Sequence, residues 1–162
     1  MAFLTINGKQ FEAKANFKFE RAADKKYKDE KGEISGVEKI YQDLMSKKIG
    51  ALLAFWDCAT AQYGKGHQPS LVDIEESLTT IIENDNEEVE QLFKDAFQTM
   101  DNSGFFRLQL KEFWKNLDLI DQLAEDEKEK KQGEIAKKMY LERRKELNPS
   151  ITIPSLETVQ DS

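Results

Sequence analysis

The opening of the chain constrains its fold more than any other segment. Asn7-Gly8 is a strong signal for a tight β-turn, because both residues accept the positive φ of a type I′ turn. Apolar and polar residues then alternate from Phe11 to Glu20, a pattern typical of a strand with one buried face. The apolar positions of this strand are Phe11, Ala13, Ala15, Phe17 and Phe19. We therefore expect a β-hairpin, which must pack on other elements because a lone hairpin is marginally stable.

Most of the remaining chain is predicted to be helical. Residues 21–36 are polar and are expected to connect the hairpin to the helices, with a short helix possible at their start. Ser35, followed by Glu38, forms a capping box that predicts the start of a helix. Apolar residues then recur at helical spacing in five segments, which cover residues 37–45, 49–59, 71–82, 89–100 and 105–123. The second of these is apolar on most sides and is predicted to be the central core helix.

The character of the chain changes after residue 124. Residues 125–147 hold seven acids and eight bases, which is typical of an exposed helix held by ion pairs or of a partly disordered segment. Asn148-Pro149 should end this segment, and the tail from 148 to 162 is predicted to be disordered. The predicted fold class is thus α+β, predominantly α, with an N-terminal hairpin packed on about five helices. The predicted domains are 1–124, the charged helical extension 125–147 and the tail 148–162.

Charge and composition narrow the classes of partner. The net charge of −7 argues against nonspecific binding to nucleic acid or to an anionic membrane. No apolar run approaches the roughly 20 residues needed to span a bilayer, and no signal peptide is expected at the N-terminus. Cys58 is the only cysteine and has apolar neighbours, so it is predicted to be a buried thiol. A reducing, cytoplasmic compartment fits this cysteine usage.

The acidic residues are unevenly distributed. Residues 70–101 carry ten acids and one base, whereas residues 1–50 carry eleven bases and eight acids. A run of this kind is usually a solvated helix face. The alternative is a surface for a basic partner, or for the basic part of a neighbouring copy of the chain.

No residue type or spacing predicts a catalytic, cofactor-binding or metal-binding site. His67, the only histidine, lies in a loop of glycine and proline, and a nucleophilic pair would require it to meet the buried Cys58. Gly64-Lys65-Gly66 lacks the remainder of a phosphate-binding loop. Trp56 and Trp114 are expected to anchor the core rather than to stack on bases.

The segment from Asp101 to Phe113 resembles a calcium loop but fails as one. If Gly104 takes the required glycine position, Thr99 and Leu110 replace the first and last carboxylate ligands. If Asp101 and Glu112 supply those carboxylates instead, Phe106 falls where glycine is needed. We therefore predict a turn between two helices, with Phe105 and Phe106 packed inward and no functional calcium site.

With these elements placed, the chain resembles the tail assembly chaperones of long-tailed bacteriophages that infect Gram-positive bacteria. The resemblance covers roughly residues 3–120 and depends on the order of several short segments. These segments are Leu4-Thr5-Ile6-Asn7-Gly8-Lys9, Phe17-Lys18-Phe19, Ser35-Gly36-Val37-Glu38-Lys39-Ile40-Tyr41, Ala51-Leu52-Leu53-Ala54-Phe55-Trp56, Gly104-Phe105-Phe106 and Phe113-Trp114-Lys115-Asn116.

The resemblance implies a non-enzymatic protein in the cytoplasm of the infected host. Such a protein coats the hydrophobic tape measure protein, keeps it soluble, helps to recruit tail tube subunits and is absent from the mature virion. The resemblance implies no cofactor and supplies no motif for partner-binding residues, which stay unknown. The charge distribution adds the hypothesis that copies self-associate head to tail. A generic protein-binding adaptor or inhibitor, or a calcium-responsive helical regulator, would be the alternatives.

Overall fold

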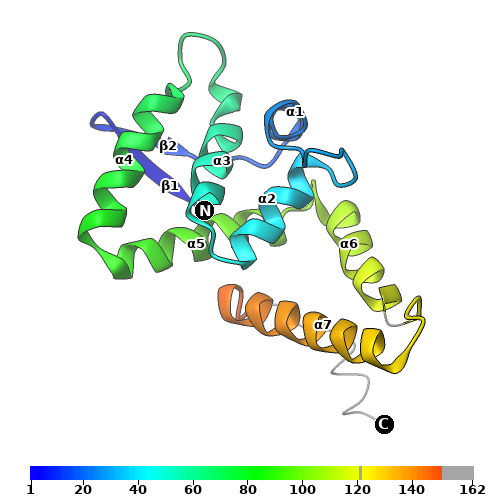
Figure 1. Cartoon of the computed structure of the whole chain (residues 1–162). Helices are drawn as coiled ribbons and strands as arrows, with labels where there is room; N and C mark the ends of the chain where they lie inside the picture. The colour runs from blue at the N-terminus through cyan, green and yellow to red at the C-terminus, as the bar shows by residue number, and fades with distance from the viewer. Residues whose placement is uncertain (121, 151–162) are drawn as a thin grey trace.

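The computed structural model describes residues 1–120 and 122–150. In chain order its elements are β1 (Phe3–Ile6), β2 (Lys9–Glu12), α1 (Phe17–Lys26), α2 (Gly36–Met45), α3 (Ile49–Ala59), the 3-10 helix η1 (Ala61–Tyr63), α4 (Leu71–Asn84), α5 (Asn86–Asp101), α6 (Arg107–Ile120) and α7 (Glu127–Leu147). The predicted fold class is confirmed, because a two-stranded N-terminal hairpin packs on a predominantly helical body (Figure 1).

The hairpin forms at the predicted turn. Asn7 and Gly8 have φ values of 52° and 78°, as a type I′ turn requires. The strands pair antiparallel, with Phe3 opposite Glu12. Leu4 and Ile6 point into the core with exposed fractions of 3% and 2%. The hairpin is therefore held by burial of its inner face as well as by its backbone hydrogen bonds.

The second strand is shorter than predicted, and the expectation that it runs to Glu20 was wrong. It ends at Glu12, and α1 begins at Phe17 because the side chain of Asn16 accepts a hydrogen bond from the backbone nitrogen of Phe19 at 3.1 Å. Residues two apart lie on nearly opposite faces of a helix. Phe19 is accordingly buried completely, whereas Phe17 is 62% exposed. The helix also covers residues 21–26, so the predicted connector does begin as a helix.

The prediction that α3 is the central helix is confirmed. It contacts α1, α2, α4 and α5, and Figure 1 shows it between α4 and α2. The largest fully buried side chains of the core include Trp56, Tyr41, Phe19, Phe55, Phe97 and Phe106. Ser35 and Ser70 cap α2 and α4 as expected, each accepting a hydrogen bond from a backbone nitrogen three residues later.

Helices α6 and α7 form a helical hairpin at one side of the body (Figure 1). The charged segment 125–147 is a continuous helix from Glu127 to Leu147, so the helical alternative is the correct one. Its C-terminal end reaches α2 and α5, where Leu147 is 1% exposed. The helix ends before Asn148 as predicted, but Asn148 is fully buried rather than part of a free tail. The rest of the predicted disordered tail, residues 151–162, lies outside the described residues.

Candidate partner-binding surfaces

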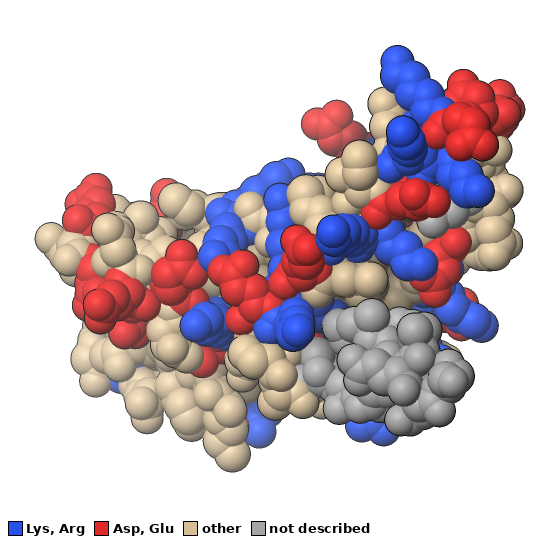
Figure 2. Space-filling view, turned by 90° about the horizontal axis from the view of Figure 1, so that it is seen from below, with Lys and Arg blue, Asp and Glu red and all other residues tan. Residues whose placement is uncertain are grey.

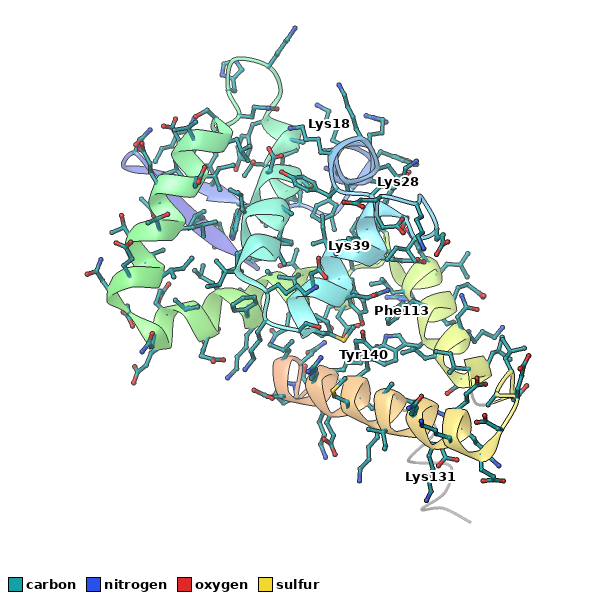
Figure 3. All side chains as sticks on the ribbon, viewed as in Figure 1. Lys18, Lys28, Lys39, Phe113, Lys131 and Tyr140 are labelled. Carbon is teal, nitrogen blue, oxygen red and sulfur yellow. The ribbon has the colours of Figure 1, made fainter. Side chains whose placement is uncertain are left out.

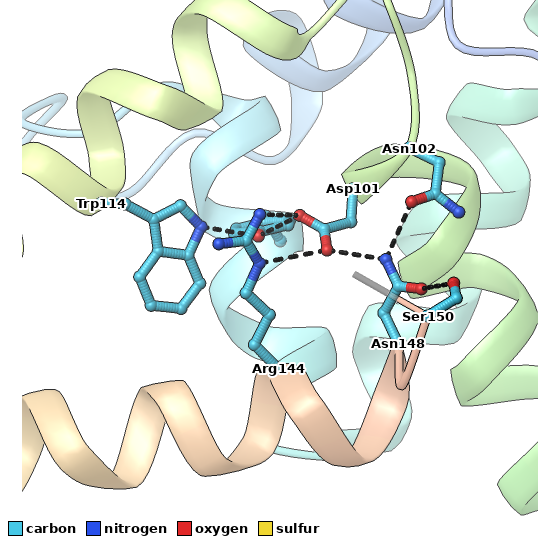
Figure 4. Close-up of polar contacts among 7 residues, drawn as sticks. Asp101, Asn102, Trp114, Arg144, Asn148 and Ser150 are labelled. Carbon is cyan, nitrogen blue, oxygen red and sulfur yellow. Dashed lines mark hydrogen bonds and ion pairs between the residues drawn. The ribbon is translucent and has the colours of Figure 1, made fainter. Parts of the chain in front are cut away.

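A cluster of buried polar side chains joins α7 to the body (Figure 4). At its centre is Asp101, whose side chain is only 1% exposed. Arg144 donates from Nε to one carboxylate oxygen at 3.2 Å and from Nη2 to the other at 3.1 Å. The hydroxyl of Tyr41 donates to the same carboxylate at 2.7 Å. Paired hydrogen bonds between arginine and carboxylate are among the stronger polar contacts in proteins.

Aromatic and amide side chains complete this cluster. The indole nitrogen of Trp114 donates to the Tyr41 hydroxyl at 2.9 Å, and the Arg144 guanidinium lies 4.7 Å from the centre of the indole ring. Asn148 donates to Asp101 at 2.9 Å. Burial raises the pKa of the Tyr41 phenol, and the Asp101 charge raises it further. Tyr41 is therefore a protonated hydrogen-bond donor at neutral pH.

The carboxylates of the segment that resembles a calcium loop are engaged in other contacts. Both carboxylate oxygens of Asp101 already accept hydrogen bonds from protein groups, while Glu112 faces solvent and pairs with Lys115 at 3.8 Å. Phe106 packs inward as predicted, but Phe105 is 42% exposed, so its predicted burial was wrong. Within residues 1–120 and 122–150, no group of three His, Cys, Asp or Glu side chains is arranged to hold a metal ion.

A second polar site fastens α1 to α3. Asp57 is 6% exposed and accepts hydrogen bonds from the hydroxyl of Tyr27 at 2.6 Å and from Nζ of Lys26 at 3.1 Å. Burial, reinforced by the Asp57 hydrogen bond, raises the pKa of the Tyr27 phenol. Asp57 therefore has two donors from the end of α1, and this contact joins α1 to α3.

An apolar groove lies at the outer end of the helical hairpin formed by α6 and α7. Its walls are Ile120, Leu123, Ala124, Glu129, Gln132 and Gly133, and we call it the arm groove. Leu123 is 78% exposed and Ile120 is 43% exposed. On α7, Ile135 and Met139 are also exposed, by 67% and 39%. Clustered apolar side chains in contact with water typically mark sites of protein–protein interaction.

Charged side chains define two further surfaces. Acidic side chains gather where α4 meets α5, at the left edge of Figure 2, and α7 carries acids and bases side by side. The exposed acids at this corner are Glu83, Asp85, Glu87 and Glu88. Helix α1 presents exposed bases, among them Lys18 (Figure 3), Arg21 and Lys25. Asp101 departs from the expected solvated acidic face because it is buried against α7.

The single histidine and the single cysteine occupy different environments. Cys58 is 1% exposed in the core, and burial raises the pKa of its thiol. His67 lies in the exposed loop before α4. Trp56 is buried in the core as predicted, whereas Trp114 is half-buried and joins the polar cluster at α7.

The polar cluster and the arm groove were not predicted from the sequence. Arg144 and Asp101 are 43 residues apart, and no local pattern indicates that they meet. Ile135 carried a weak signal, because it is an apolar residue within the charged segment 125–147. None of the helices in the described part of the chain is long and apolar enough to cross a membrane.

The fold pairs the buried carboxylates Asp57 and Asp101 internally and exposes an apolar groove, and the indole nitrogen of Trp56 is a buried donor without a hydrogen-bond partner in the described part of the chain. A family of sequences described as phage tail assembly chaperone protein, TAC, matches residues 3–115, and the chain belongs to this family. The matched region runs from the hairpin through most of α6, so the arm groove and α7 lie beyond it. No curated protein and no solved structure matches the chain.

Proposed function

We propose that this protein is a non-enzymatic chaperone that binds the phage tape measure protein and keeps it soluble while the tail is assembled. The membership of residues 3–115 in the tail assembly chaperone family carries this proposal. A tape measure protein is long and hydrophobic, so before assembly it needs a partner that covers apolar surface. The site of action would be the cytoplasm of the infected host.

The arm groove is the surface that we assign to this client. A helix of the client would lay its apolar side against Leu123 and Ile120, as amphipathic helices do in hydrophobic grooves of other proteins. The ion pair between Lys137 and Asp118, at 2.6 Å, joins α7 to α6, the two helices on either side of the groove. Charged residues at the rim, such as Glu129, keep the unoccupied protein soluble.

Several copies would coat one client molecule. The basic face of α1 and the acidic corner between α4 and α5 are complementary, and a contact between such different surfaces repeats head to tail. Recruitment of tail tube subunits by the coated client, and the absence of the chaperone from the finished virion, are further parts of the proposal. They rest on what is typical of the family.

Co-expression tests this function. We expect the tape measure protein of the same phage to be insoluble when produced alone and soluble when produced with this chain. The measurement is the fraction of tape measure protein in the supernatant after lysis. An unchanged soluble fraction would contradict the proposal, provided that the chaperone itself is soluble in the same cells.

A further inference from the structure

Helix α7 lies outside the region matched by the family, yet it is docked on that region. The matched segment ends at residue 115, and α7 begins at residue 127. Of its 21 residues only Gly133 and Leu147 are buried, so little apolar surface holds it in place. Tyr140 adds one aromatic contact, with its ring 6.4 Å from that of Phe113, toward which it points (Figure 3).

Polar contacts dominate the attachment of α7. Arg144 inserts into a site formed by Tyr41, Asp101 and Trp114, which we call the arginine socket. All three socket residues fall within the region matched by the family. The exposed pair of Lys47 with Glu146, at 2.8 Å, contributes little to stability because water screens it. The socket is therefore the main charged anchor of the C-terminal half of α7, beside the buried side chain of Leu147 and the hydrogen bond from Gln98 to the Leu147 carbonyl at 2.9 Å.

We propose that the arginine socket is a second binding site for the client and that α7 covers it in the free protein. The occupant would be a helix of the client that carries an arginine, and it would compete with Arg144 for Asp101. This inference rests on the proposed chaperone function. In this proposal α7 occupies the socket in the free protein and is displaced when a client helix binds.

The chemistry of the socket selects arginine over lysine. A guanidinium is planar, so it stacks on the Trp114 ring while two of its nitrogens donate to the two oxygens of Asp101, whereas an ammonium group is a compact point charge without this planar fork. The contacts of α7 also predict which side chains the client helix needs, and at what spacing. An aromatic residue at the Tyr140 position meets Phe113, arginine follows four residues later, and leucine three residues after that fills the site of Leu147.

Replacement of one arginine helix by another is energetically feasible. Removing α7 alone would leave Asp101 without a cationic partner, which is strongly unfavourable for a buried carboxylate. A client helix that supplies its own arginine restores that partner, so the exchange avoids the cost. As long as α7 occupies the socket, the apparent affinity for any competing helix falls by the fraction of molecules in which the socket is open.

A labelled peptide of residues 136–150 serves as the probe for this site. We expect weak binding to the intact chain, measured by fluorescence anisotropy, because Arg144 occupies the socket. The Arg144→Gln chain should bind the peptide about tenfold more tightly or better, since its own α7 competes less well. Adding Asp101→Asn to that chain should abolish the gain. Lys138→Gln, an exposed position on α7, is the matched control and should bind as the intact chain does.

Several results would overturn the inference. Equal peptide binding by the intact and Arg144→Gln chains would do so, provided that circular dichroism shows both to be folded. Equal binding of a peptide that carries lysine in place of Arg144 would also do so. If light scattering shows that the Arg144→Gln chain dimerises, the socket takes a second copy's α7 and the client assignment is wrong.

Co-expression separates this inference from the chaperone function. If the inference holds, the Arg144→Gln chain solubilises more tape measure protein than the intact chain does. Equal solubilisation by both chains would refute the role of the socket and leave the chaperone function standing. No solubilisation by either chain would refute the chaperone function itself, and with it the client assigned to the socket.

Discussion

Gly36, the first residue of α2, packs directly against the backbone carbonyl of Ala23 in α1. A β-carbon on Gly36 would overlap that carbonyl oxygen. The carboxylate of Asp24 accepts a hydrogen bond from the Gly36 nitrogen at 2.9 Å, which fixes the two helices at this point. The close approach lets Val37 and Ala23 be fully buried, so the start of α2 depends on the absence of a side chain at residue 36.

Substitution of Gly36 should therefore destabilise the fold. We expect Gly36→Ala to lower the free energy of unfolding by about 3 kcal/mol, because backbone atoms of α1 must move to admit the methyl group. Gly50→Ala is the matched control, since a β-carbon at Gly50 meets no atom within 4 Å. That change should stabilise α3 by about 0.5–1 kcal/mol. Urea unfolding measures both values, and similar losses in the two variants would contradict this packing.

The start of α1 gives a second prediction. Asn16→Ala removes the side-chain cap on the Phe19 nitrogen and should lower the free energy of unfolding by about 1 kcal/mol. Asn116→Ala, at an exposed position inside α6, should have little effect or a slightly stabilising one. Thermal unfolding followed by circular dichroism compares the two. If Asn16→Ala leaves the melting temperature unchanged, the Asn16 side chain does not cap α1 as described here.

The thiol of Cys58 should be nearly inert in the folded protein. Burial raises its pKa, so the reactive thiolate is scarce at pH 8, and the surrounding core also excludes the reagent. Alkylation by iodoacetamide should be slow in buffer and fast in urea, where an unfolded thiol regains its usual pKa of about 8.5. Mass spectrometry over time gives both rates. Fast labelling without urea would show that Cys58 is accessible.

The arm groove can be tested without disturbing the core. Leu123→Glu introduces a charge into the groove at a side chain that is 78% exposed, so the melting temperature should change little. We expect this variant to solubilise much less co-expressed tape measure protein than the unaltered chain. Leu108→Glu is the control, because Leu108 is 73% exposed on α6 but does not line the groove. Equal solubilisation by both variants would place the client elsewhere.

The sequence predicted the elements of the fold that depend on local signals. The turn at Asn7-Gly8 and the caps at Ser35 and Ser70 each involve residues close together in the chain, so their patterns were sufficient. The error at Phe17 arose because alternation over ten residues fits a strand, whereas the Asn16 cap and burial of Phe19 favour a helix. A single cap residue within a polar and aromatic segment is a weak signal.

The arginine socket depends on contacts between residues that are distant in the chain, and this explains why it was missed. The arginine socket combines Tyr41, Asp101 and Trp114 with Arg144 from the charged extension, which looked like a solvated helix. Residues 70–101 carry ten acids, and their composition alone does not show that one of them, Asp101, is buried. Only the packing of α7 on α5 and α6 identifies it.

The most direct test of the central claim is the mass of the complex that forms with the client. After co-expression, the tape measure protein should be purified by an affinity tag and analysed by size-exclusion chromatography with light scattering. The proposed function predicts one peak that contains both proteins, with several copies of this chain for each tape measure protein. Elution of this chain alone as a monomer, with no tape measure protein in its peak, would contradict the claim.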